Sequence, residues 1–257
     1  MISTERHLKI LEIISKNGFV EVSSLAEALG VSAPTIRKDL TQLEAEGKLI
    51  RIHGGAKLPD RHTNYELSFG TREDLLRGIK AEIGKKIAEI IQDGDTLFFD
   101  ASTTVWSALP YLERKKDLTI VSNVAGQILV EISRYQDISF ISSGGALRHS
   151  ISTFTGPIAE ESIRKLYVDK AFISPPGLSL AKGLTDSHLL EAQVRAAMIS
   201  SARRVYLCVD HSKFNFERFV SIAPLSEIDY VITDSPVLPE YERFFDENGI
   251  EVILVNA

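Results

Sequence analysis

Small hydroxyl residues gather at the point where a short apolar segment ends and a helical pattern begins. The segment Thr96–Phe99 is followed by Asp100-Ala101-Ser102-Thr103-Thr104. Side-chain hydroxyls and the free backbone N–H groups at the start of a helix can surround a phosphate or another anion. Serine and threonine are also ordinary residues for capping a helix. An anion-binding turn and a plain helix cap are therefore both open interpretations of these residues.

Three other polar segments follow apolar segments in the same way. They are Ser122-Asn123, Gly144-Gly145-Ala146-Leu147-Arg148 and Asp210-His211-Ser212-Lys213. If the apolar segments are parallel strands, these residues lie at the carboxyl ends of the strands, where open α/β sheets bind ligands. Gly144-Gly145 allows the backbone to come close to a ligand. A hydroxyl-rich turn, an Arg and a Lys on one rim predict a phosphorylated, polyhydroxylated ligand.

A second group of polar side chains lies near the N-terminus, on the outer face of a helical pattern. Its members are Ser32, Thr35, Arg37 and Lys38. The inward-facing stripe of the same pattern consists of Ile36, Leu40 and Leu43. Together with a preceding helix and a turn at Gly30, this layout can place the helix in the major groove of DNA, where arginine binds guanine edges or phosphate. A small helical hairpin with solvated charges is the alternative.

The elements before this helix are short. Apolar spacing over 5–16 predicts a first helix, and residues 19–22 read as a short extended link. Ser23 or Ser24 is expected to cap the second helix, while Ser32 is expected to cap the third, which runs to about Glu46.

A basic, glycine-containing segment follows the third helix. Leu49, Arg51 and His53 alternate with Ile50 and Ile52, and Gly54-Gly55 permits a sharp turn, so the segment predicts a two-stranded wing. We expect a winged helix-turn-helix over 1–57, mainly α, and a linker and entry segment over 58–78, where polar residues and Pro59 break any period.

From residue 79 to residue 257 helical and extended patterns alternate. Helices are expected over 79–92, 103–113, 124–134, 157–166, 188–202 and 238–247. Strands are expected over Thr96–Asp100, Leu118–Ser122, Ile138–Ser142, Ala171–Ser174, Val205–Val209, Tyr230–Thr233 and Glu251–Val255. Strands that are apolar on both faces and separated by helices predict a larger α/β domain with a mainly parallel sheet, covered on both sides.

Two separated blocks closely resemble the DeoR family of transcriptional regulators: Ser32–Leu40, which reads Ser-Ala-Pro-Thr-Ile-Arg-Lys-Asp-Leu, and Arg51–Ala56, which reads Arg-Ile-His-Gly-Gly-Ala. The usual family forms are Val-Ser-x-x-Thr-Ile-Arg-Arg-Asp-Leu and His-Gly-Gly-Ala. The resemblance implies contacts to operator DNA from Ser32, Thr35, Arg37 and Lys38, with help from Arg51, His53 and Lys57 in the wing. Asp39 is unusual on such a face, and we expect it to pair with a neighbouring basic side chain.

The polar segments of the second domain resemble the sensor domain of the same family. Members carry Asp-x-Gly-Thr-Thr, Thr-Asn-Asn, Gly-Gly-x-x-Arg and Asp-x-Ser-Lys there, and this chain departs from them at Ser102, Val124 and Pro175-Pro176. The resemblance implies an effector site formed by Asp100, Ser102, Thr103, Thr104, Asn123, Gly144, Gly145, Arg148, Glu191 and Lys213. It also implies a homodimeric or higher homo-oligomeric repressor of a carbohydrate-catabolism operon, which a phosphorylated sugar or related metabolite controls.

Two alternatives share this fold. The sensor domain is similar to ribose-5-phosphate isomerase, and Glu191 stands about where that enzyme carries its catalytic Glu. An isomerase needs a base and acidic or basic partners for the substrate oxygens, but the loop at Pro175-Pro176-Gly177 holds no carboxylate, so we expect no enzyme activity and no catalytic residue. In the other alternative the second domain only makes the regulator oligomeric, and no ligand changes DNA binding.

Bulk composition agrees with a DNA-binding regulator without requiring one. The net charge is −6, made up of +1 over residues 1–57 (eight Lys or Arg against seven Asp or Glu) and −7 over the rest. The single cysteine, Cys208, and the absence of an apolar leader or span predict a cytoplasmic protein. His188 and His211 lack companions at metal-ligand spacing, so we expect no metal and no cofactor.

Overall fold

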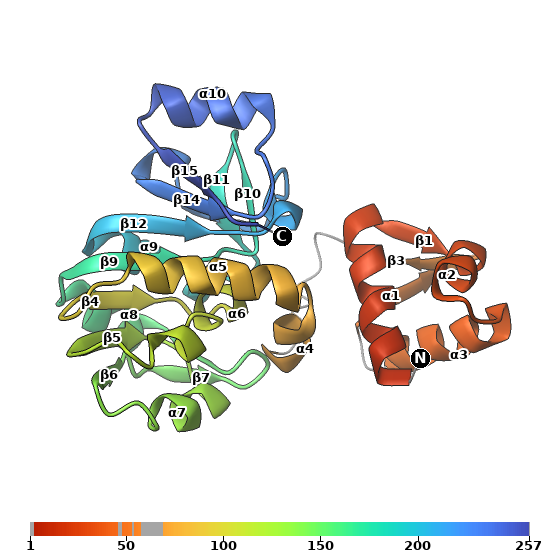
Figure 1. The fold of residues 1–257 in the computed structure, drawn as a ribbon, viewed down its shortest axis with the longest axis horizontal. Coiled ribbons are helices and arrows are strands. Elements are labelled where there is room, and N and C mark those ends of the chain that lie inside the picture. The colour runs from red at the N-terminus through yellow and green to blue at the C-terminus, as the bar shows by residue number, and fades with distance from the viewer. Residues whose placement is uncertain (1–2, 46–47, 53, 58–68, 257) are drawn as a thin grey trace. The chain divides into compact units, whose positions relative to one another are not determined.

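The computed structural model describes residues 3–45, 48–52, 54–57 and 69–256. The chain divides into two compact units, residues 1–76 and 77–257, each of which is described by itself (Figure 1). The expected linker at 58–78 falls largely on residues 58–68, outside the described residues, so its boundaries stay a prediction.

The N-terminal unit combines short helices with very short strands. Its elements are α1 (Ser3–Asn17), β1 (Phe19–Glu21), α2 (Val22–Leu29), α3 (Ala33–Ala45), β2 (Ile50–Ile52), β3 (Gly55–Lys57) and α4 (Phe69–Asp74). The predicted inward stripes form its core, and the side chains buried to 1% exposure or less include Ile10, Leu11, Ile14, Leu25, Ile36, Leu40 and Leu43. This packing is what holds α2 and α3 as a helix-turn-helix pair.

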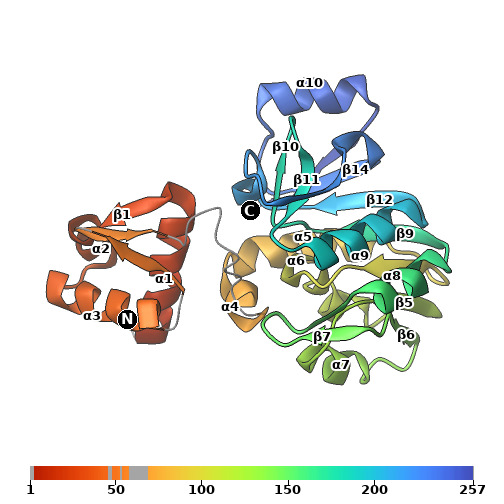
Figure 2. The same cartoon turned by 180° about the vertical axis from the view of Figure 1, so that it is seen from behind.

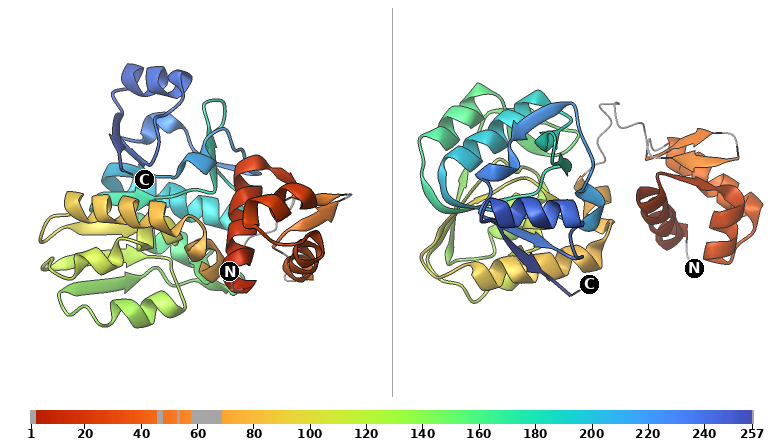
Figure 3. Two further views of the ribbon diagram at one scale, coloured as in Figure 1. Left: turned by 45° about the vertical axis from the view of Figure 1, so that its right-hand side comes forward. Right: turned by 90° about the horizontal axis from the view of Figure 1, so that it is seen from above.

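The wing differs from the expected two-stranded hairpin. Residues 19–21, which read as a link, form β1 and pair antiparallel with β3, so the described strands of this unit make a sheet in the order β1-β3-β2. Figure 3 shows the unit, in red and orange, from two further sides. Glycine at position 55 lets β3 lie this close to β1, because a Cβ there would lie 2.2 Å from the Val20 carbonyl oxygen. The expectation that Ser23 or Ser24 caps α2 is wrong: α2 begins at Val22, whose N–H donates instead to the Gly54 carbonyl at 2.9 Å.

The C-terminal unit is built on a parallel sheet. Its helices are α5 (Arg77–Ile90), α6 (Thr103–Trp106), α7 (Gln127–Ile132), α8 (Pro157–Arg164), α9 (Leu189–Ser200) and α10 (Pro239–Glu247), with 3-10 turns at Leu109–Leu112, His211–Lys213 and Leu225–Glu227. Its strands are β4 (Thr96–Phe99), β5 (Leu118–Ser122), β6 (Ile138–Ser142), β7 (Ala146–Arg148), β8 (Thr153–Thr155), β9 (Val168–Ile173), β10 (Gly177–Ser179), β11 (Gly183–Asp186), β12 (Ala202–Cys208), β13 (Val220–Ala223), β14 (Tyr230–Thr233) and β15 (Glu251–Leu254).

Within the described residues the main sheet has the order β15-β14-β12-β9-β4-β5-β6, and every neighbouring pair is parallel. The helix α5 crosses one face of this sheet, and α8 and α9 cover the other, as the two opposite views show (Figures 1 and 2). The mainly parallel sheet covered on both sides is therefore confirmed. Strands buried on both faces explain why they read as continuous apolar segments.

Two small antiparallel additions were not expected. The strands β7 and β8 form a hairpin after β6, and β10, β11 and β13 form a separate small sheet. In the chain, the hairpin follows the main-sheet strand β6, β10 and β11 follow β9, and β13 follows β12. They bring polar side chains toward the same end of the sheet as the predicted effector residues.

Candidate functional site

The helix α3 presents the polar face that its pattern predicts. Arg37 and Lys38 are exposed, whereas Ile36 on the same turn is fully buried. The Ser32 hydroxyl lies 2.9 Å from the Thr35 hydroxyl and 3.4 Å from the Thr35 backbone nitrogen, at the start of the helix. Four polar side chains thus stand at the front of a helix whose other face is held by the core.

The wing is tied to α3 by hydrogen bonds that involve Arg51. The Arg51 guanidinium donates to the Thr41 hydroxyl at 2.7 Å, and its backbone N–H donates to the Glu44 carboxylate at 2.9 Å. Arg51 is nevertheless exposed, and Lys57, at the end of β3, is half-buried. The third predicted wing residue, His53, lies outside the described residues.

Asp39 has the structural role expected of it. Its carboxylate is buried and accepts from Arg6 at 2.6 and 2.9 Å, and the His7 ring lies 3.0 Å away. Burial raises the pKa of this carboxyl, but the hydrogen bonds from Arg6 and His7 outweigh burial and hold the pKa below its ordinary value. An ionised Asp39 therefore fixes α3 to α1, and the prediction of a basic partner is confirmed.

In the C-terminal unit the hydroxyl turn after β4 is buried. The Ser102 hydroxyl accepts from the Val105 N–H at 3.2 Å, so Ser102 is the N-cap of α6. Thr103 and Thr104 follow it, and the buried ammonium of Lys80 on α5 donates to the Thr103 hydroxyl at 3.1 Å. Lys80 was not among the expected site residues, because a lysine in an amphipathic helix pattern normally reads as part of the solvated face.

A second lysine, Lys213, lies in the 3-10 turn that follows β12. Asp210, at the end of that strand, is buried and accepts from the Ser212 N–H at 3.0 Å. Burial raises the pKa of the Asp210 carboxyl, but Lys213, the Ser212 hydroxyl and Lys80 lower it below its ordinary value. The charges of Lys80 and Lys213 thus both act on the Asp210 carboxyl, and Lys80 also contacts the hydroxyl turn.

Glu191 joins three segments that are distant in the sequence. Its carboxylate, 1% exposed, accepts from the Arg148 guanidinium at 3.0 Å, from the Asn123 amide at 3.4 Å and from the Thr153 hydroxyl. These contacts connect α9 with the end of β5 and with the β7–β8 hairpin. Arg148 is therefore paired with Glu191.

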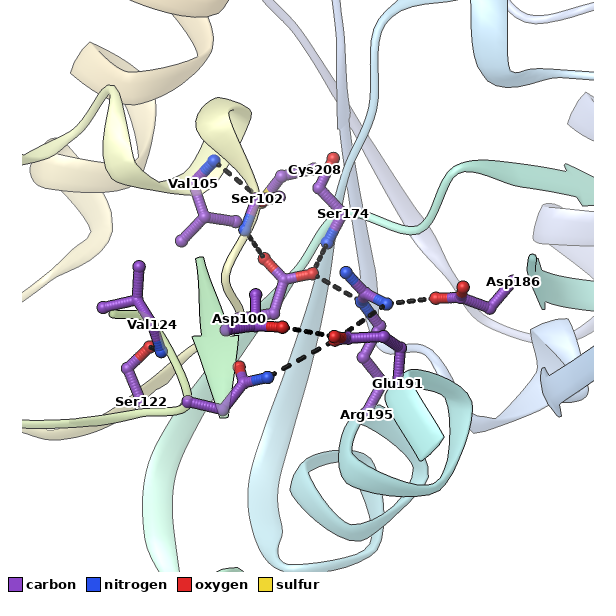
Figure 4. A network of polar contacts seen from close by, with 12 residues as sticks. Asp100, Ser102, Val105, Ser122, Val124, Ser174, Asp186, Glu191, Arg195 and Cys208 are labelled. Carbon is purple, nitrogen blue, oxygen red and sulfur yellow. Dashed lines mark hydrogen bonds and ion pairs between the residues drawn. The ribbon is translucent and has the colours of Figure 1, made fainter. Parts of the chain in front are cut away.

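The centre of the site is a buried arginine that sequence reasoning missed. Arg195, on α9, donates to Asp100 at 2.9 Å and to Asp186, and it lies 4.0 Å from Glu191 (Figure 4). Burial lowers the pKa of this guanidinium, but Asp186, Asp100 and Glu191 outweigh burial and raise the pKa above its ordinary value. Asp100 also accepts from the N–H groups of Ser102 and Ser174, so the network reaches the hydroxyl turn.

The need for glycine at position 145 is explained by packing within the chain and not by close approach to a ligand. Its φ is +109°, and a Cβ there would lie 2.6 Å from the Thr155 carbonyl oxygen and 3.0 Å from the Ala159 Cβ. Glycine at this position therefore lets β8 and the start of α8 pack against the loop. Gly144, with φ +61°, has open space where its Cβ would be.

Two family models match most of the chain. Residues 6–62 match the family model described as the DeoR-like helix-turn-helix domain, and residues 77–235 match the DeoR C terminal sensor domain. The chain belongs to the DeoR family. It is therefore a DNA-binding transcriptional regulator and not an enzyme, and the family resemblance of the recognition helix, the wing and the sensor segments is confirmed.

Similar curated proteins align over almost the whole DeoR-family chain. The uncharacterized HTH-type transcriptional regulator YulB of Bacillus subtilis is 34% identical over 99% of this chain and 98% of its own. The HTH-type transcriptional repressor GlcR of the same species is 32% identical over 99% and 97%. The glycerol-3-phosphate regulon repressor of Escherichia coli is 33% identical over 92% of each chain.

Solved structures resemble this DeoR-family chain only weakly. A ribose 5-phosphate isomerase from Plasmodium falciparum is 15% identical, covers 53% of this chain and 52% of its own, and has a TM-score of 0.38, which is too low to argue from. No helix in the described ranges is long and apolar enough to cross a membrane. Among the same residues no group of three or more His, Cys, Asp or Glu side chains could hold a metal ion.

Proposed function

We propose that this DeoR-family regulator represses a carbohydrate-catabolism operon and is released from its operator by a phosphorylated sugar or a related metabolite. The buried ammonium of Lys80 at the Thr103 hydroxyl, with Lys213 nearby, carries the effector part of this proposal. Ammonium and hydroxyl groups that lie side by side are donors to the oxygens of a phosphate. The names of two relatives, a repressor GlcR and a glycerol-3-phosphate regulon repressor, support the proposal.

The two ends of the effector have different partners in this proposal. The phosphate binds at Ser102, Thr103 and Thr104 with Lys80 and Lys213. The hydroxyl groups of the effector bind beside Glu191 and its two donors, Asn123 and Arg148. The regulator acts as a homodimer or higher homo-oligomer, because helix-turn-helix proteins read two half-sites.

Arg37→Ala tests the DNA part. Arg37 is exposed at the front of α3, so its loss should weaken operator binding by about 1–3 kcal/mol, and the loss should depend on one base position if Arg37 reads a base. Operator fragments selected from genomic DNA by the purified chain serve as probes in gel-shift titrations. Lys165→Ala is the matched control, because it removes one exposed positive charge from the other unit. If the two variants bind the operator with equal affinity, Arg37 does not contact the DNA.

A panel of sugar monophosphates tests the effector part on the full chain. Each compound is added to the regulator bound to its operator, and the fraction of DNA released is measured. We expect at least one monophosphate to release the DNA and its unphosphorylated parent to have no effect. If the whole panel leaves DNA binding unchanged, the C-terminal unit serves oligomerisation and not sensing.

A further inference from the structure

The wing strand β2 carries Arg51 on the face that turns toward the core of the N-terminal unit. Arg51 lies directly opposite Ala56 on β3, and Ala56 lies directly opposite Val20 on β1. Side chains of directly opposite residues stand on the same face of a sheet. Ala56 and Val20 are both buried in the core of this unit. The Arg51 side chain is therefore on the inner face of the sheet, where the helices pack.

The neighbours of Arg51 along the chain indicate the same orientation. Leu49, two positions earlier, is buried in the same core, and alternate residues of an extended segment share a face. Ile50 and Ile52 belong to the other face, where Ile52 is 41% exposed. The outer face of β2 is therefore apolar, while its arginine is directed toward α3.

The partner of the guanidinium lies on the stripe of α3 that carries Arg37. Thr41 and Glu44 follow Arg37 by four and seven positions, a spacing that places all three on one face of a helix. The Thr41 hydroxyl donates to the Arg37 carbonyl oxygen at 2.8 Å and accepts from the Arg51 guanidinium at 2.7 Å. A hydroxyl has one hydrogen to donate and lone pairs that accept, so both bonds form together. One hydroxyl thus joins Arg51 to the turn of α3 that presents Arg37.

The backbone of β2 is held by the same face of α3. In the sheet that the described strands of this unit form, β2 is at an edge, and edge strands present unpaired N–H groups. The Arg51 N–H donates to the Glu44 carboxylate at 2.9 Å. The side chain and the backbone of Arg51 therefore bind α3 at two positions one turn apart. Arg51, Thr41 and Glu44 are called the wing clamp below.

We propose that Arg51 is a positioning residue: through the wing clamp it fixes the wing relative to the recognition helix α3, and it does not itself neutralise a phosphate of the operator. The family resemblance implies that Arg51 contacts DNA, whereas the clamp gives it a different role in the same function. A wing that is fixed before binding lowers the cost of ordering the interface. This inference rests on the proposed function, in which the Arg37 face of α3 contacts the operator.

Thr41→Val tests the clamp without changing a charge. Valine has nearly the shape of threonine and is also β-branched, but it has no hydroxyl to accept from Arg51. In gel-shift titrations of the full chain, its operator affinity should fall by about two- to tenfold, the value of one hydrogen bond. Thr41→Ser keeps the hydroxyl and should bind like the wild type. Wild-type affinity in Thr41→Val overturns the proposal.

Arg51→Met and the double variant Thr41→Val/Arg51→Met show how the affinity is lost. Residues that act through one shared contact lose it once, whereas independent contacts to DNA add. The double variant should therefore bind no more weakly than Arg51→Met alone. Losses that add in the double variant overturn the proposal.

The salt dependence of binding gives a second readout that a direct phosphate contact cannot imitate. Each phosphate that a protein neutralises contributes about 0.9 to the slope of log affinity against log salt concentration. Arg51→Met and the uncharged change Thr41→Val should have the same slope. A slope that is smaller by about 0.9 in Arg51→Met alone shows that Arg51 binds a phosphate and overturns the proposal.

Thermal unfolding followed by circular dichroism verifies that each variant is folded before its affinity is compared. The Arg37→Ala titration separates failure of this inference from failure of the proposed function. Wild-type affinity in Arg37→Ala contradicts the proposed DNA face of α3, whereas the clamp is decided by the variants of Thr41 and Arg51 alone. Equal losses in Thr41→Val, Arg51→Met and the double variant, with equal salt slopes, support the clamp.

Discussion

Replacement of Arg195 by methionine is expected to lower the free energy of unfolding of the C-terminal unit by about 3–5 kcal/mol. The guanidinium is buried and pairs with Asp100 and Asp186, while Glu191 lies 4.0 Å away. Methionine fills a similar length but neutralises nothing, so buried carboxylates lose the cation that they share. An unpaired buried charge costs far more than a lost surface contact, which is the physical reason for the size of the effect.

The measurement is denaturant unfolding followed by the fluorescence of Trp106. This is the single tryptophan of the chain and is buried in the C-terminal unit, so it reports on that unit alone. Arg164→Met is the matched control on the neighbouring helix α8, because its pair with Glu160 is solvent-exposed. Exposed pairs contribute about 0–1 kcal/mol. Equal stability of the two variants would show that Arg195 is not the centre of a charge network.

Lys80→Met is expected to weaken binding of the phosphorylated effector by about ten- to a hundredfold, which corresponds to about 1.5–3 kcal/mol for a charged hydrogen-bond partner. Methionine keeps the buried apolar part of the side chain on α5 and removes only the ammonium. Binding to operator DNA without effector should stay unchanged, because Lys80 belongs to the C-terminal unit. The variant should therefore remain on the DNA at effector concentrations that release the wild type.

The matched control is Lys86→Met on the same helix, where the partly exposed lysine pairs with Glu89. Calorimetry with inorganic phosphate and with the active compound of the panel measures affinity, and Trp106 fluorescence verifies that both variants are folded. Because coupling is reciprocal, operator DNA must change effector affinity by the same factor as effector changes DNA affinity. If Lys80→Met binds the effector as tightly as the wild type does, the phosphate of the effector does not bind at Lys80.

Much of the fold follows from local pattern. The expected bounds of β5, β6 and β14 agree with the structure, and the main-sheet strands and their helices are present within a few residues. The segment expected as one helix over 103–113 is instead α6 and a 3-10 turn. The small strands β7, β8, β10, β11 and β13 were missed, because strands of three or four residues owe their pairing to distant partners.

The sequence by itself determined the family, the outward face of α3 and the gathering of hydroxyl and glycine turns at one end of a parallel sheet. Each of these depends on neighbours in the chain, on periodicity or on motif spacing. Only the tertiary structure decided which charges are buried and paired. Arg195 and Asp100 are separated by 95 positions, and Lys80 and Thr103 by 23. A charged residue in a helical pattern reads as solvated until its burial is known, because the desolvation that makes it functional arises from packing between segments.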